Sequence, residues 1–348
     1  MNFSDIFWKA DESAYRSDTA ISYSDISQYM QMGKDIVNHF REKKSSYGLS
    51  LGTVLDCLIT EGIQTFSEKY LLTDFNPENK GEQLVEGIFN YIAASTLKEA
   101  VKDGGVVQMI TDSSYYPNRT LESRLTALFK IEKYWDDLTK AAKDHKQIIS
   151  SSLYDEANEL VDKLKGNTLT NNLLFAEVEE GETFNQPKLE TIIDGIKFRC
   201  MIDRLIVDHN KKRIFMIDLK YTSSSLDAFL DSYVHWNYQI QTRLYRSILR
   251  EKLKGTEFSD YEVKDYIYVV VNKEDALAFS IKIPNGDIIY KAESGKEYYF
   301  PDPIRLGAEL DNLLKSGLQP VSDTLIKQKL NPLLKGQFGL VNIKPIHL

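Results

Sequence analysis

Two short apolar segments each carry an acidic residue among isoleucine and leucine neighbours. Asp203 interrupts residues 198–207, and Asp218 interrupts residues 213–220, where Lys220 follows two positions later. Both segments have the composition of strands, in which residues two apart share a face, so Asp218 and Lys220 should project together. Carboxylates inside apolar strands need a compensating cation, and a neighbouring lysine can hold an anion or a water.

A hairpin between these segments would bring the two acids together. If Asn210-Lys211 forms a two-residue loop, the antiparallel register places Asp203 opposite Asp218. Opposite residues have Cβ atoms about 4.5–5.5 Å apart, so two carboxylates there repel each other and suit Mg²⁺ or Mn²⁺, which prefer oxygen ligands. Alternatively, the acids and Lys220 form salt bridges on the polar face of an edge hairpin, and a one-residue slip of register would separate the acids.

The elements that must position these residues follow from a change of pattern near residue 170. Before it, apolar residues recur at spacings of three and four, which predicts a series of amphipathic helices. Beyond it the period falls to two, with strands expected over 188–193, 197–208, 213–221, 266–271 and 276–283, and helices over 234–254 and 301–314. This order predicts an α/β fold with a mixed central sheet flanked by helices, preceded by a helical region.

Composition indicates a folded globular chain, because 42% of its 348 residues are hydrophobic and 27% are charged. The net charge of −8 provides no global attraction for nucleic acid. Residues 197–220 nevertheless hold seven Lys and Arg against three Asp, which indicates either phosphate contacts or a solvated strand edge. Four nearby aromatics could stack on bases or pack in the core, namely Tyr221, Tyr233, Trp236 and Tyr238.

Two cysteines, Cys57 and Cys200, are too few for an iron–sulfur cluster or a disulfide framework, and we expect buried free thiols. The first residues lack the pattern of a signal peptide, and no run of about 18 apolar residues occurs. We therefore expect a cytoplasmic protein that does not associate with membranes.

The acids and the lysine resemble a known signature. Asp203 followed by Asp218-Leu219-Lys220 resembles the PD-(D/E)XK nucleases, in which an acid on one strand precedes a D/E-x-K on the next. Residues 218–225 resemble the D-[LV]-K-T-T-x-S segment of RecB-like nucleases and phage exonuclease VIII-like proteins. Gln241 and Tyr245 match the Q-x-x-x-Y of the same family on one helical face, although the same spacing also suits a half-buried helix.

The resemblance extends upstream to three further candidates. Asp56 follows Gly52 at the position where RecB-like nucleases place a metal-binding histidine, so a helix over about residues 50–70 would contribute to the active site. Aspartate is a competent ligand for hard metals, but Asp56 could equally be a helix-surface acid. Gln186 and Glu190 both fit the Gln or Glu that approaches the metal from the first core strand, and the sequence does not choose between them.

This resemblance implies a Mg²⁺-dependent (or Mn²⁺-dependent) nuclease that hydrolyses DNA. The metal ligands would be Asp203, Asp218, the Leu219 carbonyl and Asp56. Lys220 would act on the attacking water. Gln241 and Tyr245 would position the DNA strand or the lysine. The resemblance favours a phage or prophage exonuclease in recombination or DNA processing. A structure-specific endonuclease and a catalytically silent nucleic-acid-binding module are the alternatives.

Domain organisation and partners are predicted as well. We expect a helical region over residues 1–170, a nuclease core over 171–320 and a tail over 321–348. No G-x-x-x-x-G-K-[ST] loop is present, so the chain should not drive its own translocation with ATP. Processivity would then come from a homo-oligomer, or from a partner such as a single-strand annealing or single-strand binding protein.

Overall fold

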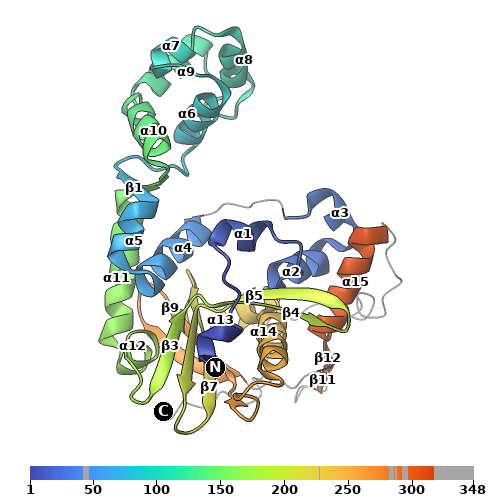
Figure 1. Cartoon of the computed structure of the whole chain (residues 1–348). Coiled ribbons are helices and arrows are strands. Elements are labelled where there is room, and N and C mark those ends of the chain that lie inside the picture. The colour runs from blue at the N-terminus through green and yellow to red at the C-terminus, as the bar shows by residue number, and fades with distance from the viewer. Residues whose placement is uncertain (42–46, 227, 282–285, 287, 292–296, 317–348) are drawn as a thin grey trace. The chain divides into compact units, whose positions relative to one another are not determined.

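The computed structural model describes residues 1–41, 47–226, 228–281, 286, 288–291 and 297–316 (Figure 1). The chain forms two compact units: Met1–Lys44 with Lys163–Leu348, here the strand unit, and Ser45–Asp162, here the helical unit. The division expected at residues 170 and 320 stays a prediction, because contacts alone do not define regions that fold independently. Residues 321–348, expected as a tail, lie outside the described residues.

The helical unit is built from short amphipathic helices and one small sheet. Its elements are α4 Tyr47–Thr60, α5 Gly62–Lys69, β1 Tyr70–Thr73, α6 Lys80–Tyr91, α7 Leu97–Ala100, α8 Gly104–Asp112, α9 Leu121–Phe129, α10 Lys133–Asp144, β2 Gln147–Ser150 and α11 Ser151–Gly166, the last of which runs on into the strand unit. Thr96, Asp103 and Thr120 cap the helices that follow them. Trp135 and Tyr134 lie at the centre of an apolar core. The helical pattern is thus confirmed here, whereas the parallel pair β1–β2 was not foreseen.

The strand unit contains the remaining elements. Its helices are the 3-10 turns η1 Phe3–Ile6 and η2 Gly33–Asp35, with α1 Glu12–Ser17, α2 Tyr23–Met32, α3 Ile36–His39, α12 Thr168–Leu174, α13 Phe229–His235, α14 Tyr238–Leu253 and α15 Pro303–Ser316. Its strands are β3 Gly181–Asn185, β4 Lys188–Ile193, β5 Ile196–Met201, β6 Arg204–Asp208, β7 Arg213–Tyr221, β8 Glu262–Val263, β9 Tyr266–Val271, β10 Ala276–Ile281, β11 Ile288–Lys291 and β12 Glu297–Phe300.

The central sheet has the order β10-β9-β7-β6-β3, with β8 beside one end of β7. Strands β6 and β7 are antiparallel, whereas β7 and β9 are parallel, so the sheet is mixed. A parallel pair needs a crossover, and the chain between β7 and β9 forms α13 and α14. Helix α14 contacts β4, β5, α2 and α15. The predicted α/β class, with a mixed sheet flanked by helices, is therefore confirmed.

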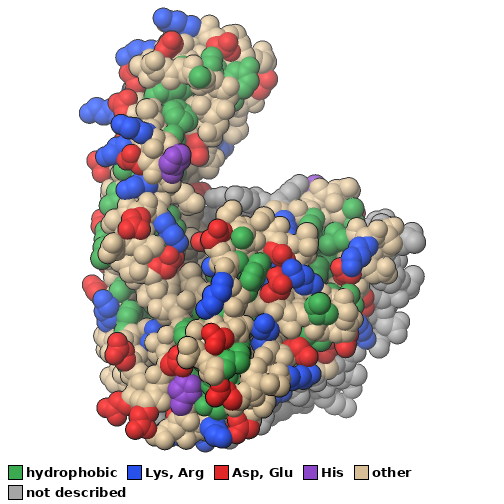
Figure 2. All heavy atoms as spheres, viewed as in Figure 1, with side chains coloured by type: hydrophobic (Ala, Val, Ile, Leu, Met, Phe, Trp, Pro, Cys, Tyr) green, Lys and Arg blue, Asp and Glu red, His purple; other side chains and the backbone are tan. Residues whose placement is uncertain are grey.

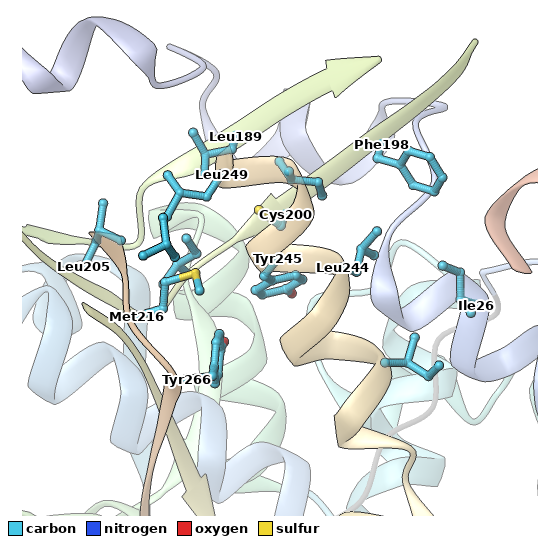
Figure 3. Close-up of a cluster of buried hydrophobic side chains, with 14 of the residues drawn as sticks. Ile26, Leu189, Phe198, Cys200, Leu205, Met216, Leu244, Tyr245, Leu249 and Tyr266 are labelled. Carbon is cyan, nitrogen blue, oxygen red and sulfur yellow. The ribbon is translucent and has the colours of Figure 1, made fainter. Parts of the chain in front are cut away.

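The apolar core of the strand unit lies between α14 and the strands. Figure 3 shows Leu244 and Tyr245 of α14 close to Cys200 of β5, Met216 of β7 and Tyr266 of β9, all members of one buried cluster. Cys200 and Cys57 are both buried free thiols, as expected. Burial of this cluster fixes the face that α14 turns toward β7, which carries Asp218.

Several elements of the strand unit differ from the predictions. The strand expected over 197–208 is two strands, β5 and β6, which belong to different sheets. The helix expected over 234–254 is interrupted at Asn237, which adopts the left-handed conformation that asparagine tolerates better than most residues. Strand β3 was not foreseen at all.

No helix within the described ranges is both long enough and apolar enough to cross a membrane.

Candidate active site

Asp218 and Lys220 form a buried ion pair in β7. Asp218 is 0% exposed, and Lys220 Nζ lies 2.5 Å from its Oδ2. The two side chains therefore share one face of the strand, as their spacing predicted. Strand β7 lies between β6 and β9, so this ion pair is held by a strand that has neighbours on both sides.

The register of the β6–β7 hairpin is the predicted one, although its loop is longer. Pairing runs from Arg204↔Ile217 to Asp208↔Arg213, and one further step of the same register sets Asp203 against Asp218. The two-residue loop was wrong: residues 209–212 connect the strands. The register survives because the loop takes one extra residue from each strand.

Asp203 lies just before β6, where two antiparallel ribbons meet at a corner. Pairs β3–β6 and β4–β5 continue one register, in which Gln186 is opposite Asp203. The Gln186 amide, in the left-handed region at φ 49°, donates to the Asp203 carbonyl over 2.9 Å, and Ile202 N donates to Pro187 O over 3.2 Å. Pro187 has no N–H to continue the ladder, so the ribbon bends there.

The Asp203 side chain reaches across to β7. Its Oδ2 accepts a hydrogen bond of 2.8 Å from the amide of Leu219. Within a strand the N–H and C=O of one residue point to the same side, so the Leu219 carbonyl is also directed toward Asp203. The predicted set of Asp203, Asp218 and the Leu219 carbonyl is thus gathered at one edge of the hairpin.

Helix α14 and strand β9 each provide a hydrogen-bond donor to the Asp218 carboxylate. Gln241 Nε2 donates to Asp218 Oδ1 over 2.6 Å, and the Tyr266 hydroxyl donates to the same oxygen over 3.3 Å. Burial, followed by the charge of Asp218, raises the pKa of Tyr266 well above its ordinary value, so the hydroxyl keeps its proton and donates. Together these bonds fix the orientation of the carboxylate.

Tyr245 lies one layer behind these groups. Its ring is 6.3 Å from that of Tyr266, and the side chain is buried in the core cluster (Figure 3). Burial is the main cause that raises the pKa of its hydroxyl. The helical spacing therefore brings Gln241 into direct contact with Asp218. It places Tyr245 against Tyr266, which also donates a hydrogen bond to Asp218. The catalytic roles assigned to both residues remain predictions.

Lys220 carries a proton in this setting. Burial by itself lowers the pKa of the ammonium group, but attraction by Asp218 and Asp203 outweighs it, so the pKa is raised above that of an ordinary lysine. The ring of Tyr238 lies 5.1 Å from Nζ, which adds a cation–π contact. The lysine is thus a held positive charge, suited to contact a phosphate oxygen or a water.

The upstream candidates divide between the two units. Gln186 is the register neighbour of Asp203, whereas the Glu190 side chain pairs with Lys197 over 2.8 Å. The geometry therefore favours Gln186 over Glu190 as the residue near the acids. Asp56 lies on α4 in the helical unit, so its role as a ligand, and the contribution of residues 50–70 to the site, stay predictions.

The basic residues of the hairpin are largely engaged by acids. Lys211 pairs with Asp208, Lys212 with Asp260 and Arg213 with Glu262, at distances of 3.8, 2.5 and 3.5 Å. Arg199 and Arg204 are buried. Figure 2 likewise shows Lys and Arg side chains interspersed with Asp and Glu on the visible face. The solvated strand edge is therefore the better interpretation of this tip, and Lys220 is the basic residue that lies at the acids.

The donor set fits a hard divalent ion. Within the described ranges no group of three or more His, Cys, Asp or Glu side chains is arranged to hold a metal. Two carboxylates, Asp203 and Asp218, lie beside one ammonium group, and the Leu219 carbonyl adds a neutral oxygen. Magnesium is often held by one or two carboxylates with waters and substrate phosphates completing its shell, so two acids are sufficient.

A depression of about 650 Å³ lies in the helical unit, and its lining includes none of the predicted site residues. Its lining includes Lys80, Glu82, Tyr116, Arg119 and Lys130.

Two residues at the site were missed by sequence reasoning about its chemistry. Tyr266 begins an uninterrupted apolar strand, so no pattern in the sequence set it apart from the core residues that follow it. The feature that could have identified it is the parallel pairing of its strand with β7. Tyr238 was noted as an aromatic near the site and as the first residue of a Y-x-x-Q-x-x-x-Y spacing with Gln241 and Tyr245, but its contact with Lys220 was not expected.

A family model described as a PDDEXK-like domain of unknown function (DUF3799) matches residues 114–293. Among solved structures, the chain is similar to a crystal structure from Eubacterium rectale described as a candidate exonuclease, with 11% identity over 95% of this chain and 96% of that chain and a TM-score of 0.45. The crystal structure of SSO0001 shares 15% identity over 53% of this chain and 70% of that chain, with a TM-score of 0.23. No curated protein matches the chain. The segment matched by the family model is more than half of the chain and includes the hairpin and α14.

Proposed function

Because the chain belongs to the PDDEXK-like family DUF3799, we propose that it is a divalent-metal-dependent nuclease that hydrolyses DNA. More specifically, we propose a phage-type or prophage-type exonuclease that serves recombination or DNA processing. The observation that carries the proposal is the arrangement in β7. The Lys220 ammonium contacts the buried Asp218 carboxylate, and the amide of the intervening Leu219 binds Asp203. One ammonium beside two carboxylates matches what phosphodiester hydrolysis requires of a protein.

Metal ligation would fall to Asp203, Asp218 and the Leu219 carbonyl, with Asp56 proposed as a further ligand. A bound Mg²⁺ or Mn²⁺ supplies an activated water and stabilises charge on the scissile phosphate. Lys220 holds its proton and donates to a phosphate oxygen or to the attacking water, which orients that water and offsets the charge that develops.

The groups behind the acids keep the site in one geometry. Gln241 and Tyr266 both donate to Asp218 Oδ1, so the carboxylate cannot rotate freely. Tyr245 packs behind Tyr266 and limits its movement. Such support matters because an error of about 1 Å in the position of a reacting group can cost about 100-fold in rate.

Resemblance of residues 218–225 to the exonuclease VIII-like segment supports the exonuclease over the structure-specific endonuclease. The intact set of Asp203, Asp218 and Lys220 supports an active enzyme over a silent binding module. A single-strand annealing or single-strand binding protein, or a homo-oligomer, remains the proposed means of processivity.

The test is to incubate the purified protein with linear duplex DNA and with covalently closed circles of the same sequence. We expect Mg²⁺-dependent loss of the linear form from its ends, persistence of the circles, and no reaction in EDTA. Cleavage of the circles would replace the exonuclease with an endonuclease. Persistence of both substrates with Mg²⁺ and with Mn²⁺ would contradict a nuclease.

A further inference from the structure

The aromatic residues near Lys220 differ sharply in exposure. Tyr233 and Tyr268 are buried, at 4% and 0% exposed, and Tyr238 is half-buried against the lysine. Trp236 is 46% exposed. It lies in the turn between α13 and α14, two residues before Tyr238. The Trp236 ring is therefore accessible to a ligand, whereas the buried tyrosines are not.

The backbone of Trp236 is held firmly. Its carbonyl accepts hydrogen bonds from the Tyr23 hydroxyl, at 2.6 Å, and from Ser27 Oγ, at 3.5 Å. Its amide donates to the Ser232 carbonyl over 2.9 Å. The next residue, Asn237, is buried and left-handed, which sets the direction in which the chain enters α14.

The ring is also constrained on one side. The His235 imidazole lies 4.5 Å from it at an interplanar angle of 85°. The indole is thus an exposed surface presented by a fixed turn. A ligand that stacks on such a group loses little free energy in ordering it.

Trp236 is linked to the lysine of the site through Tyr238. Consecutive Cα atoms are 3.8 Å apart, so the Cα atoms of Trp236 and Tyr238 are at most about 7 Å apart. The Tyr238 ring in turn lies 5.1 Å from Lys220 Nζ. Tyr23, which binds the Trp236 carbonyl, is also within electrostatic reach of the site: burial raises the pKa of its hydroxyl, while Lys220 acts to lower it.

We propose that Trp236 is a base-stacking residue, which binds a nucleobase of the DNA strand within a few nucleotides of the bond cleaved at Lys220. The inference rests on the proposed nuclease function and names a contact for its substrate. Nucleobases all present flat π faces, so an aromatic ring beside a phosphate-binding cation holds a strand without selecting its sequence. Successive stacked bases are about 3.4 Å apart along a strand, so a few nucleotides span the separation between Trp236 and Lys220.

The first experiment uses the fluorescence of the protein itself. The chain has three tryptophans, of which Trp135 is 1% exposed and Trp8 is half-buried. We would titrate the full chain with a single-stranded oligonucleotide in Ca²⁺, and follow binding independently by anisotropy of a label on the DNA. Stacking should quench the wild-type emission. W236F should bind the labelled DNA but lose most of the quenching, whereas W8F, the matched control, should keep it.

The second experiment locates the base. Oligonucleotides with one abasic position, moved along the strand, would serve as substrates in Mg²⁺. For the wild type, one position near the cut should raise KM about tenfold, the effect expected for losing one base–aromatic stack. W236A should raise KM similarly on intact DNA and lose its sensitivity to that position, and W236F should partly restore it. A residue that only supports the fold would not remove a positional dependence.

The outcomes separate the two ideas. Quenching by W236F equal to that of the wild type, or a W236A enzyme that keeps the positional dependence, would overturn the stacking contact while leaving the nuclease intact. A wild-type protein that neither binds nor cleaves any DNA would remove the proposed function, and the stacking contact with it.

Discussion

The Leu219 amide donates a hydrogen bond to Asp203 Oδ2 over 2.8 Å. This bond joins an acid at the end of one strand to the backbone of the next, one residue beyond Asp218. The separation of the two carboxylates is therefore determined by main-chain geometry, in addition to the register of the hairpin. Rigid support of this kind is what a site needs if it is to hold a metal ion in a fixed position.

Removing the lysine should separate catalysis from ion binding. Lys220→Ala should lower kcat about 100-fold or more, because it deletes the positive charge at the reacting phosphate. It also leaves Asp218 buried without its cation, which costs about 3 kcal/mol of the free energy of unfolding when divalent ions are absent. Added Mg²⁺ should restore part of this stability, so thermal unfolding with and without Mg²⁺ checks the result.

The control for that variant is Lys211→Ala, which removes an exposed hairpin-tip lysine paired with Asp208. It should change both kcat and the midpoint of unfolding very little, since exposed ion pairs contribute about 0–1 kcal/mol. A Lys220→Ala enzyme with near wild-type kcat would remove the lysine from the catalytic set.

Replacing the buried acid should abolish both cleavage and metal binding. Asp218→Asn preserves the shape of the side chain but removes the negative charge that a divalent ion requires. We expect no measurable turnover and at least a tenfold weaker Mn²⁺ affinity by calorimetry, in line with the loss of a ligand. Asp260→Asn, which changes an exposed acid between α14 and β8 that pairs with Lys212, is the matched control and should bind the ion normally. Unchanged Mn²⁺ affinity in Asp218→Asn would show that the ligand assignment is wrong.

The two donors to Asp218 should differ in importance. Gln241 donates over 2.6 Å and Tyr266 over 3.3 Å, so Gln241→Ala should reduce kcat more than Tyr266→Phe. A hydrogen bond to a charged group contributes about 1.5–3 kcal/mol, which corresponds to a loss of about tenfold or more for Gln241→Ala. Steady-state kinetics with KM measured separately would test this order. The reverse order would mean that Tyr266 is the principal support.

Asp56 provides the riskiest prediction, because it rests on the resemblance to RecB-like nucleases, in which a histidine stands at that position. If Asp56 is a metal ligand, Asp56→Ala should reduce cleavage strongly with little loss of stability. Asp56→His should move the preference from Mg²⁺ toward Mn²⁺, since imidazole suits softer ions than a carboxylate does. Glu68→Ala, an exposed acid on the neighbouring α5, should leave the rate unchanged. Normal cleavage by Asp56→Ala would place the residue on the helix surface with no catalytic role.

The local sequence was sufficient to predict the register of the β6–β7 hairpin, but it was insufficient to predict the corner at Asp203. Centring the loop on Asn210 and Lys211 gave the correct register of β6 and β7, even though the loop is longer than expected. The break at Ile202 and Asp203 was missed because the apolar run continues through it; its cause is Pro187 on the partner strand, which is recognisable only once the pairing is known.

The same distinction holds for the supporting residues. Gln241 was identified because helical spacing is a local property. Tyr266 was not, because its approach to Asp218 depends on a parallel pairing between strands that are distant in sequence. The interruption at Asn237 had a signal, since asparagine tolerates the left-handed conformation, but apolar periodicity on both sides concealed it.

The corner at Asp203 has a mechanical consequence. Asp203 lies in the short connection between the β4–β5 ribbon and the central sheet, so a tilt of the ribbon would rotate the Asp203 carboxylate relative to Asp218. For the proposed nuclease, substitutions on the outer face of that ribbon should therefore change the rate of cleavage from a distance. In the proposed nuclease, evolution could then adjust the speed of cleavage while every group that contacts the substrate is retained.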